Sequence, residues 1–213
     1  MNASDKVIGR LSHYRLLLSK LESQGKTFVF SRELAIMADG TSAQVRRDLM
    51  VTGYEGNPKQ GYNVSDLLDE LNKFFNFSRG VNAVLIGTGS LGRALLSYFM
   101  PKKSRYNIMA AFDSELSKTG RIIAGTRCCH INELEFELKS LGSVVAILTL
   151  PAEAAQTMAT RLTNCGIKGI LNFAPVRLRV PDDVYVENID VTMSLEKVAF
   201  FANQKSEDRE KEV

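Results

Sequence analysis

The chain has 213 residues, of which 45% are hydrophobic and 24% charged, a composition that suits one large or two modest globular domains. It contains no run of about 20 apolar residues, and its first residues lack the apolar core of a secretory signal, so we expect a cytoplasmic protein that does not enter a membrane. Its net charge of +3 lies wholly within residues 1–65, which indicates a polyanion-binding module beside a neutral domain.

The segment 31–50, SRELAIMADGTSAQVRRDLM, predicts a helix, a short turn and a second helix. Ser31 is expected to cap the first helix, and Thr41 with Gln44 fits a capping box for the second. Two helices joined by so short a turn are typical of the helix-turn-helix, whose second helix enters the major groove of DNA.

Helical spacing in the second helix turns Val45 and Leu49 toward the core and leaves Arg46 and Arg47 exposed. The helix starts with small residues such as Ser42, so it can enter a major groove where the arginines reach phosphates or guanine edges. An alternative to DNA recognition stays open, in which the two arginines simply form the solvent-exposed face of an ordinary helix pair.

The next stretch, TGYEGNPKQGYNV at 52–64, has spaced glycines and ends in β-prone residues, as expected of a hairpin. It predicts the wing of a winged helix-turn-helix. We assign residues 1–80 to this DNA-binding module and its connector, 81–190 to a nucleotide-binding domain and 191–213 to a C-terminal helix with a flexible tail.

From residue 81 to 190, apolar strands alternate with helical patterns, which predicts an α/β domain with a doubly wound parallel sheet of the Rossmann type. The strands are expected in five segments: VNAVLIG, NIMAAFD, SVVAILTL, GIKGILNF and DVYVENI.

Gly87, Gly89 and Gly92 form a G-x-G-x-x-G turn between the first of these strands and a helix. Such glycines permit the tight turn, the approach of a pyrophosphate and close helix–strand packing. Asp113 ends the next strand about 20 residues later, where a carboxylate accepts ribose hydroxyls and repels a 2′-phosphate, so NAD(H) is favoured over NADP(H). A turn that serves packing alone, with a merely solvated Asp113, stays possible.

Cysteine and histidine are scarce. Cys128, Cys129 and Cys165 show no CxxC spacing, so we expect reduced thiols and no metal site, while a redox input from Cys128 or Cys129 stays open. His13 lies in the first helix and His130 is expected in an exposed loop, so neither is placed to serve hydride transfer and no enzyme activity is expected.

The segment 191–204, VTMSLEKVAFFANQ, is too apolar for a free terminal helix, whereas KSEDREKEV after it is expected to be a frayed tail. The helix must therefore pack against another surface.

Motifs along nearly the whole chain resemble the Rex family of redox-sensing transcriptional repressors: RLSHYRLLL, AQVRRDL, GYNV, GTGSLGRALLSY, AFD, ILTLPAEAAQ, GIKGILNFAP and VENIDV. The resemblance implies a homodimer in which the C-terminal helix packs between the domains of the other subunit. It further implies NADH and NAD⁺ as cofactors, binding to palindromic double-stranded operator DNA in the apo or NAD⁺ form, and release by NADH.

With the resemblance, the motifs give three sets of expected site residues. Nucleotide contacts are expected from Gly87, Thr88, Gly89, Ser90, Leu91, Gly92, Asp113, Thr149, Pro151, Asn172, Phe173, Ala174 and Pro175. DNA contacts are expected from Ser31, Ser42, Ala43, Gln44, Arg46, Arg47, Lys59 and Tyr62. Tyr98 and Asp190 correspond to a family network that couples the two sites.

The chain departs from the family pattern in two places. The wing has NPKQ at 57–60 where the family has an Arg-Gly or Lys-Gly element, so Lys59 is its single base and its minor-groove contact is in doubt. Leu16 stands where some members have the network arginine, and Arg15 points about 100° away around the helix, so different coupling is expected.

Two other functional classes stay open from the sequence. One is a small NAD-dependent oxidoreductase with an appended helical domain. The other is a DNA-binding protein whose Rossmann domain is a dimerisation scaffold or binds another nucleotide, such as a CoA derivative.

Overall fold

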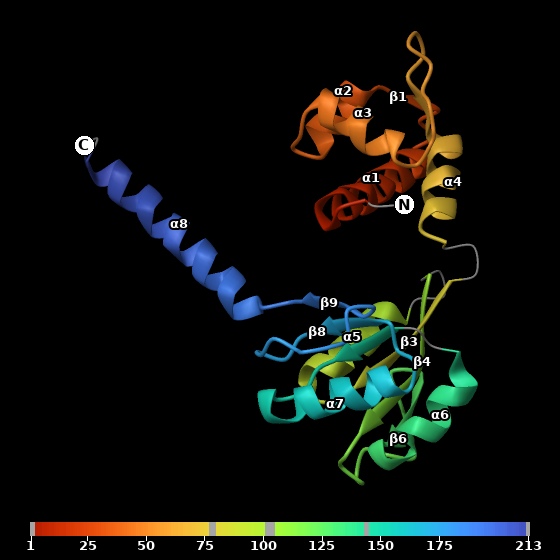
Figure 1. The fold of residues 1–213 in the computed structure, drawn as a ribbon. Helices are drawn as coiled ribbons and strands as arrows, with labels where there is room; N and C mark the ends of the chain where they lie inside the picture. Colours follow the sequence, from red (N-terminus) through yellow and green to blue (C-terminus); the bar gives the residue numbers. More distant parts are fainter. Residues whose placement is uncertain (1–2, 77–79, 101–104, 143–144, 212–213) are drawn as a thin grey trace. The chain divides into compact units, whose positions relative to one another are not determined.

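The computed structural model describes residues 3–76, 80–100, 105–142 and 145–211. The chain forms two compact units, Met1–Arg79 and Gly80–Val213 (Figure 1). In the described part of the chain, no helix combines the length and the apolar character that crossing a bilayer requires.

Unit 1 is a helical domain with a short antiparallel strand pair. Its elements are α1 (Asp5–Ser23), β1 (Phe28–Val29), α2 (Ser31–Met37), α3 (Ser42–Met50), β2 (Tyr62–Asn63) and α4 (Val64–Phe74). Its core contains fully buried leucines from α1, α2, α3 and α4, so the four helices share one apolar centre. The predicted helix-turn-helix, α2 and α3, is confirmed.

The caps of α2 and α3 differ from each other. Thr41 caps α3 as predicted, because its hydroxyl accepts the backbone N–H of Gln44 at 3.2 Å. The prediction that Ser31 caps α2 is wrong by one residue, since Phe30 is the N-cap and Ser31 is the first helical residue. The Glu33 carboxylate accepts the N–H of Phe30 at 2.8 Å, which supplies the cap and leaves the Ser31 hydroxyl for another partner.

The wing is a hairpin closed at Asn57 and Gly61, whose backbone groups exchange hydrogen bonds of 2.8 and 2.7 Å. Gly61 has φ +83°, the left-handed conformation that ends a three-residue hairpin loop. Pro58 takes the second position of the turn, where a fixed φ near −65° is favourable. The unusual NPKQ sequence is thus well suited to the hairpin itself.

Unit 2 contains a seven-stranded sheet in the order β5-β6-β4-β3-β7-β8-β9. All neighbouring strands are parallel except β5, which pairs antiparallel with β6. The strands are β3 (Val81–Ile86), β4 (Tyr106–Asp113), β5 (Arg121–Ile123), β6 (Thr126–His130), β7 (Val145–Leu148), β8 (Gly169–Asn172) and β9 (Tyr185–Asn188). The predicted parallel α/β sheet is confirmed. The strand order changes direction between β3 and β7, and doubly wound folds bind nucleotides at this topological switch point.

Helices cover both faces of the sheet (Figure 1). They are α5 (Ser90–Phe99), η2 (Ile131–Glu133), α6 (Leu134–Leu141) and α7 (Ala152–Asn164). The last helix, α8 (Val191–Lys211), follows β9 and does not cover the sheet; its residues 191–204 are exposed. Val84 and Ile86 of β3 pack with α6 and α7, whereas Leu85 packs with α5 on the other face. The later residues of this strand are therefore apolar without alternation, as is typical of a strand covered on both faces.

The structure differs from the sequence-based predictions in three places in unit 2. The hairpin β5–β6 was not expected, and His130 is the last residue of β6 rather than part of a loop; its Nδ1 accepts the N–H of Asn132 and caps η2. Ala124 and Gly125 form the turn with φ +45° and +77°. The tail expected from Lys205 is helical as far as Lys211, in keeping with its helix-forming Glu, Lys and Arg residues.

Candidate functional site

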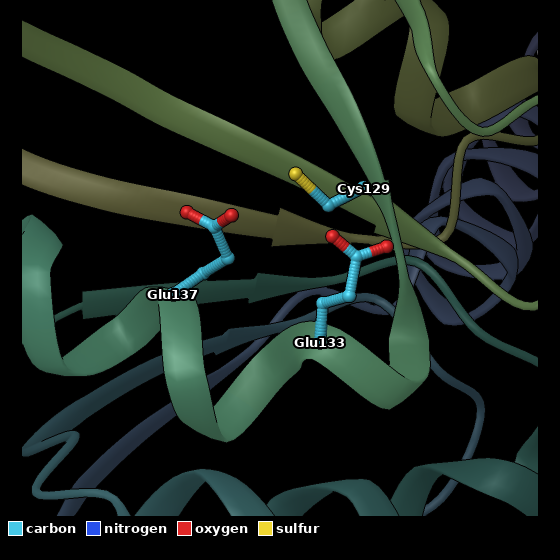
Figure 2. Close-up of side chains that lie close together, drawn as sticks. All are labelled: Cys129, Glu133 and Glu137. Atoms are coloured by element: carbon cyan, nitrogen blue, oxygen red, sulfur yellow. The ribbon is translucent and has the colours of Figure 1, made fainter.

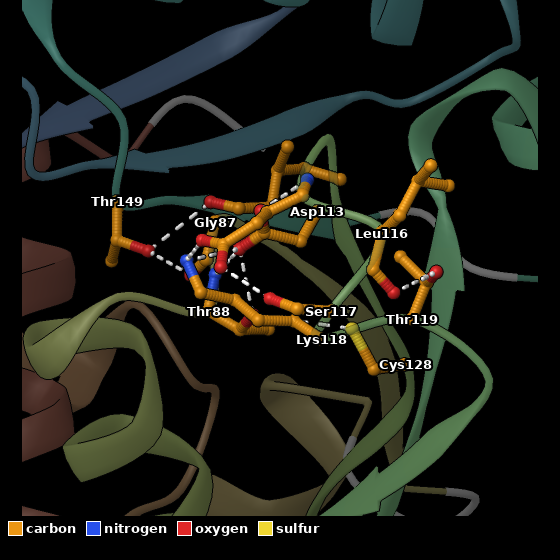
Figure 3. A network of polar contacts seen from close by, with 11 residues as sticks. Gly87, Thr88, Asp113, Leu116, Ser117, Lys118, Thr119, Cys128 and Thr149 are labelled. Carbon is orange, nitrogen blue, oxygen red and sulfur yellow. Dashed lines mark hydrogen bonds and ion pairs between the residues drawn. The ribbon is translucent and has the colours of Figure 1, made fainter.

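The glycine turn after β3 is held against the end of β7. Gly87 has φ +96°, and a Cβ there would lie 2.7 Å from the carbonyl oxygen of Thr149. The Thr149 hydroxyl donates to the carbonyl oxygens of Gly87 at 2.7 Å and Ile86 at 3.1 Å (Figure 3). A Cβ at Gly92 would overlap the Gly87 carbonyl oxygen. These two glycines therefore serve the close packing of turn, strand and helix.

Gly89 has a different environment. A Cβ there would meet no atom within 4 Å, and its φ of −65° suits any residue. It is the N-cap of α5, and no side chain caps this helix end. The first N–H groups of a helix have no intrahelical partners and carry the positive end of its dipole. The start of α5 can therefore hold a phosphate beside Gly89.

The carboxylate of Asp113 is fixed by the glycine turn. Its Oδ2 accepts the Thr88 N–H at 2.7 Å and the Thr88 hydroxyl at 2.6 Å, and its Oδ1 accepts the Glu115 N–H at 3.0 Å (Figure 3). The ammonium of Lys118 lies 3.6 Å from Oδ2 and 2.5 Å from a Glu115 oxygen. Burial alone would raise the pKa of Asp113, but these donors outweigh it and lower the pKa, so the group is ionised at neutral pH.

A cavity of about 550 Å³ opens at the ends of β3, β4 and β7, a size typical of small-molecule sites. Seven of the expected nucleotide-binding residues line it: Gly87, Gly89, Ser90, Leu91, Asp113, Thr149 and Pro151. The structure thus brings the glycine turn, Asp113 at the end of β4 and the segment 149–151 after β7 together around one cavity.

Several lining residues were missed by sequence reasoning. They include Ser114, Lys118, Ile131, Ala154, Met158 and Arg161. Three of these share one face of α7 with Pro151 at spacings of three or four residues, a pattern that could have been found in the sequence. Arg161 donates to both oxygens of Glu135 at 2.7 and 2.9 Å, and to the Ile131 carbonyl at 2.9 Å.

The remaining expected residues do not line this cavity. Thr88 is fully buried and supports Asp113, and Gly92 packs under the turn. Asn172 is 1% exposed; its amide donates to the Val176 carbonyl at 2.8 Å and to Asn188 Oδ1 at 2.9 Å. It shapes the turn after β8 that carries the remaining expected residues, Phe173, Ala174 and Pro175.

In unit 1, the exposed face of α3 is as predicted: Val45 and Leu49 are buried, whereas Arg46 and Arg47 are exposed. Sequence reasoning missed Asp48, which is 2% exposed on the same helix.

Asp48 ties α3 to α1. Its carboxylate accepts two hydrogen bonds from Arg10 at 2.6 and 2.7 Å and one from the Tyr14 hydroxyl at 3.0 Å. Burial and the bond to Asp48 raise the pKa of Tyr14 to about 12. The partners lie 38 and 34 residues apart in the chain, so no local pattern could show them.

A groove of about 310 Å³ lies between the start of α2, α3 and the wing. Arg46 donates to the Ser31 hydroxyl at 3.2 Å across it. Tyr62 also lines it but is 8% exposed, and a Cβ at Gly56 would lie 2.7 Å from its ring, so Tyr62 mainly supports the groove. Lys59 is exposed in the wing loop.

The expected DNA contacts at the start of α3 are at least partly accessible: Ser42, Ala43 and Gln44.

The two residues expected to couple the sites lie at or near the ends of different helices. Tyr98 is 75% exposed near the end of α5, and Asp190 accepts the N–H of Met193 at 2.8 Å at the start of α8. Among the described residues of one chain, no hydrogen bond joins Tyr98 to Asp190.

Leu16 is 58% exposed and Arg15 8% exposed, so the two side chains leave α1 in different directions, as its helical geometry predicts.

Both Cys128 and Cys129 are buried, and burial raises the pKa of each thiol. The thiolate form that reacts with oxidants is therefore scarce, which argues against a redox input from either residue.

Two family models match the chain. The model "CoA binding domain" matches residues 79–176, and "Putative DNA-binding protein N-terminus" matches residues 2–49. The two matches fall on the sheet domain that holds the cavity and on the part of unit 1 that holds the helix-turn-helix.

Proteins named redox-sensing transcriptional repressor Rex are similar over most of their length. The one from Carboxydothermus hydrogenoformans is 40% identical, with 92% of this chain and 94% of that protein covered, and the one from Bacillus velezensis is 40% identical, with 92% and 91% covered. Crystal structures of RSP, a Rex-family repressor, are also similar, with 32% sequence identity. The complex with β-NAD⁺ and operator DNA has a TM-score of 0.89 and covers 100% of this chain and 98% of that one. The complex with β-NADH has a TM-score of 0.86 and covers 99% of this chain and 98% of that one.

Proposed function

Because the chain belongs to the Rex family of redox-sensing transcriptional repressors, we propose that it represses transcription by binding palindromic operator DNA in the apo or NAD⁺ form and is released when NADH binds. The observation that carries the proposal is the cavity at the uncapped start of α5, in the same chain as a helix-turn-helix with two exposed arginines. The relatives are repressors, and this chain is a regulator rather than an enzyme.

The cavity residues divide between the parts of a dinucleotide. Backbone N–H groups near Gly89, Ser90 and Leu91 would hold the pyrophosphate, and the ionised Asp113 would accept the adenosine ribose hydroxyls. Thr149 and Pro151 would lie toward the nicotinamide, together with the segment 172–175. The cavity residues fit NAD(H), and the carboxylate disfavours a 2′-phosphate.

The difference between the two redox forms lies in the charge of the ring. The oxidised nicotinamide is positively charged, so its burial costs more free energy than burial of the neutral reduced ring. An arrangement of the chain that encloses the ring would therefore favour NADH. To shift a two-state population almost completely from one state to the other, a ligand must bind the favoured state about 10⁴-fold more tightly, a difference of about 5.5 kcal/mol in binding free energy.

DNA binding would use α3 in the major groove. Arg46 and Arg47 would reach phosphates or guanine edges, while Ser31 orients Arg46 through their hydrogen bond. Asp48 fixes α3 on α1, so the arginines project from a rigid support. Lys59 in the wing loop is placed to reach a phosphate or the minor groove.

A second copy of the chain would cover α8. Along this helix Val191, Met193, Leu195, Val198, Phe200 and Phe201 are 47–66% exposed, an apolar surface that is unusual for a free helix. A dimer would present two recognition helices to half-sites about 34–36 Å apart, and a change in their separation would release the DNA. We place this action in the cytoplasm, where a bacterial repressor meets its operators.

The test is a DNA-binding titration at fixed salt. A duplex selected from a randomised pool by the nucleotide-free protein would be titrated with protein alone, with NAD⁺, with NADH and with coenzyme A. We expect tight binding in the first two cases and release by NADH. Equal affinity under all four conditions would overturn redox sensing, and release by coenzyme A but not by NADH would identify a different nucleotide.

A further inference from the structure

β6 and α6 bring three metal-ligating side chains together outside the nucleotide cavity. The Cys129 sulfur and one carboxylate oxygen each of Glu133 and Glu137 all lie within 4.8 Å of one another. Figure 2 shows the sulfur and both carboxylates turned toward a common space between the strand and the helix. The residues follow one another at intervals of four along the chain, across the change from strand to helix.

The two carboxylates place negative charge close together. Glu133 and Glu137 are one helical turn apart, where like charges repel. The Arg127 guanidinium lies 3.5 Å from one oxygen of Glu137, but its side chain is 64% exposed, so it compensates this charge only weakly. One oxygen of Glu133 accepts the His130 N–H at 3.2 Å, a bond that caps the helix without adding a cation.

The Cys129 thiol is the third member of the group and is itself 97% buried, with 3% exposed. Within the described residues the thiol has no hydrogen-bond partner. Cys129 packs at the border of the apolar core of the sheet domain, and its sulfur is turned toward the two carboxylates. The geometry thus gathers one buried sulfur and two carboxylates around a common space, beside the largely exposed Arg127.

We propose that Cys129, Glu133 and Glu137 bind one Zn²⁺ ion per chain. Zinc binds thiolate sulfur and carboxylate oxygen, and three protein ligands with a water form a common four-coordinate site. Binding forms a Zn–S bond as the thiol proton passes to solvent, without change in oxidation state. The three anionic ligands, Arg127 and Zn²⁺ together carry no net charge.

The geometry allows this coordination with small movements. Ligand atoms around tetrahedral zinc lie about 3.5 Å apart, so the group must contract by roughly 1 Å. Glu133 is exposed, which permits its carboxylate to move and a water to complete the coordination from the solvent side. No metal site was expected from the sequence because its cysteines lack CxxC spacing, whereas this set has the spacing Cys-x₃-Glu-x₃-Glu.

The test uses the reduced, full-length protein after chelator treatment. Titration with Co²⁺ should produce a thiolate-to-metal charge-transfer band that saturates at one ion per chain and disappears when Zn²⁺ is added. Cys129→Ser should abolish the band, whereas the matched control Cys165→Ser should retain it. No band in the unaltered protein, or a band that survives Cys129→Ser, would overturn the proposal.

The two carboxylates are tested separately because their side chains are not in the core. Glu133→Gln and Glu137→Gln should each weaken Co²⁺ binding at least tenfold, since loss of even an outer-shell partner costs about 10–100-fold. The exposed Glu153, in the first turn of α7, supplies the control variant Glu153→Gln, which should bind as before. Far-UV circular dichroism checks that each variant is folded. Unchanged affinity in both carboxylate variants would overturn the site even if Cys129→Ser failed to fold.

Discussion

Substitution of Gly89 by alanine separates nucleotide binding from folding. A Cβ at Gly89 meets no atom within 4 Å, and the backbone there, with φ −65°, is accessible to alanine. The added methyl group would therefore occupy the open space at the start of α5, where we place the pyrophosphate. We expect Gly89→Ala to weaken NADH binding while the chain stays folded.

The size of the effect follows from what the methyl group displaces. As an N-cap, alanine is worse than glycine by about 1 kcal/mol at most, so the free energy of unfolding should change little. An extra methyl group in a filled site costs about 1–3 kcal/mol. That loss corresponds to a roughly 5–150-fold higher Kd for NADH.

Two further glycines supply the controls. Gly9→Ala, in the middle of α1, also meets no atom within 4 Å; it should stabilise unit 1 by about 1 kcal/mol and leave NADH affinity unchanged. Gly92→Ala would force Cβ into the Gly87 carbonyl oxygen, so it should lower both stability and affinity. Urea unfolding and NADH fluorescence titration measure the two quantities. If Gly89→Ala binds NADH as tightly as the unaltered chain, the pyrophosphate does not lie at this turn.

Three other outcomes concern unit 1. Asp48→Asn should destabilise unit 1 by about 2–3 kcal/mol in urea unfolding. This is below the about 3–5 kcal/mol for breaking a fully buried ion pair because Arg10 is partly exposed. The same variant should bind DNA more weakly and NADH as before. Because the pKa of Tyr14 is raised to about 12 by burial and its bond to Asp48, its stabilising contribution is complete below pH 10 and is lost as pH rises toward 12; Tyr14→Phe should therefore lose less stability than the unaltered chain between pH 9 and pH 12. Arg46→Ala and Arg47→Ala should each weaken DNA binding by about 1–3 kcal/mol if the residue reads a base, or lower the salt dependence by about one charge if it contacts a phosphate; unchanged affinity in both would mean that α3 is not the recognition helix.

Patterns within one element predicted its type and its buried face. The spacing of Val45 and Leu49 gave the core side of α3, and Thr41 gave its start, because both depend on residues within two turns of each other. The alternation of apolar strands with helices likewise predicted the parallel sheet. Strand β6 was not predicted because Arg127 interrupts its apolar residues and because the Ala124–Gly125 turn before it lacks the Asn-Gly, Asp-Gly or Gly-Gly pair that indicates a two-residue hairpin.

Contacts between distant segments could not be predicted in this way. Asp48 looks like one polar residue in an exposed RRDL motif, and only the packing of α1 against α3 shows that it is buried with Arg10. Similarly, the sequence NFAP does not show that the Asn172 amide donates to Asn188 and to the Val176 carbonyl in the turn after β8. In both cases a polar side chain is buried because folding supplies a partner that lies elsewhere in the chain.

The charged groups that line the cavity are better suited to binding a nucleotide than to transferring protons. Three of the described lining residues are charged at neutral pH: Asp113, Lys118 and Arg161. Thr88 and the other donors around Asp113 hold its pKa below the usual range despite burial, whereas hydrogen bonds to Glu115 and Glu135 raise the pKa of Lys118 and Arg161. Each group is thus held further in its charged form, and its pKa is shifted further from neutral pH. General acid–base catalysis is most efficient when a group has its pKa near the working pH, whereas the fixed charges of this cavity and the backbone N–H groups at the start of α5 suit the recognition of a nucleotide.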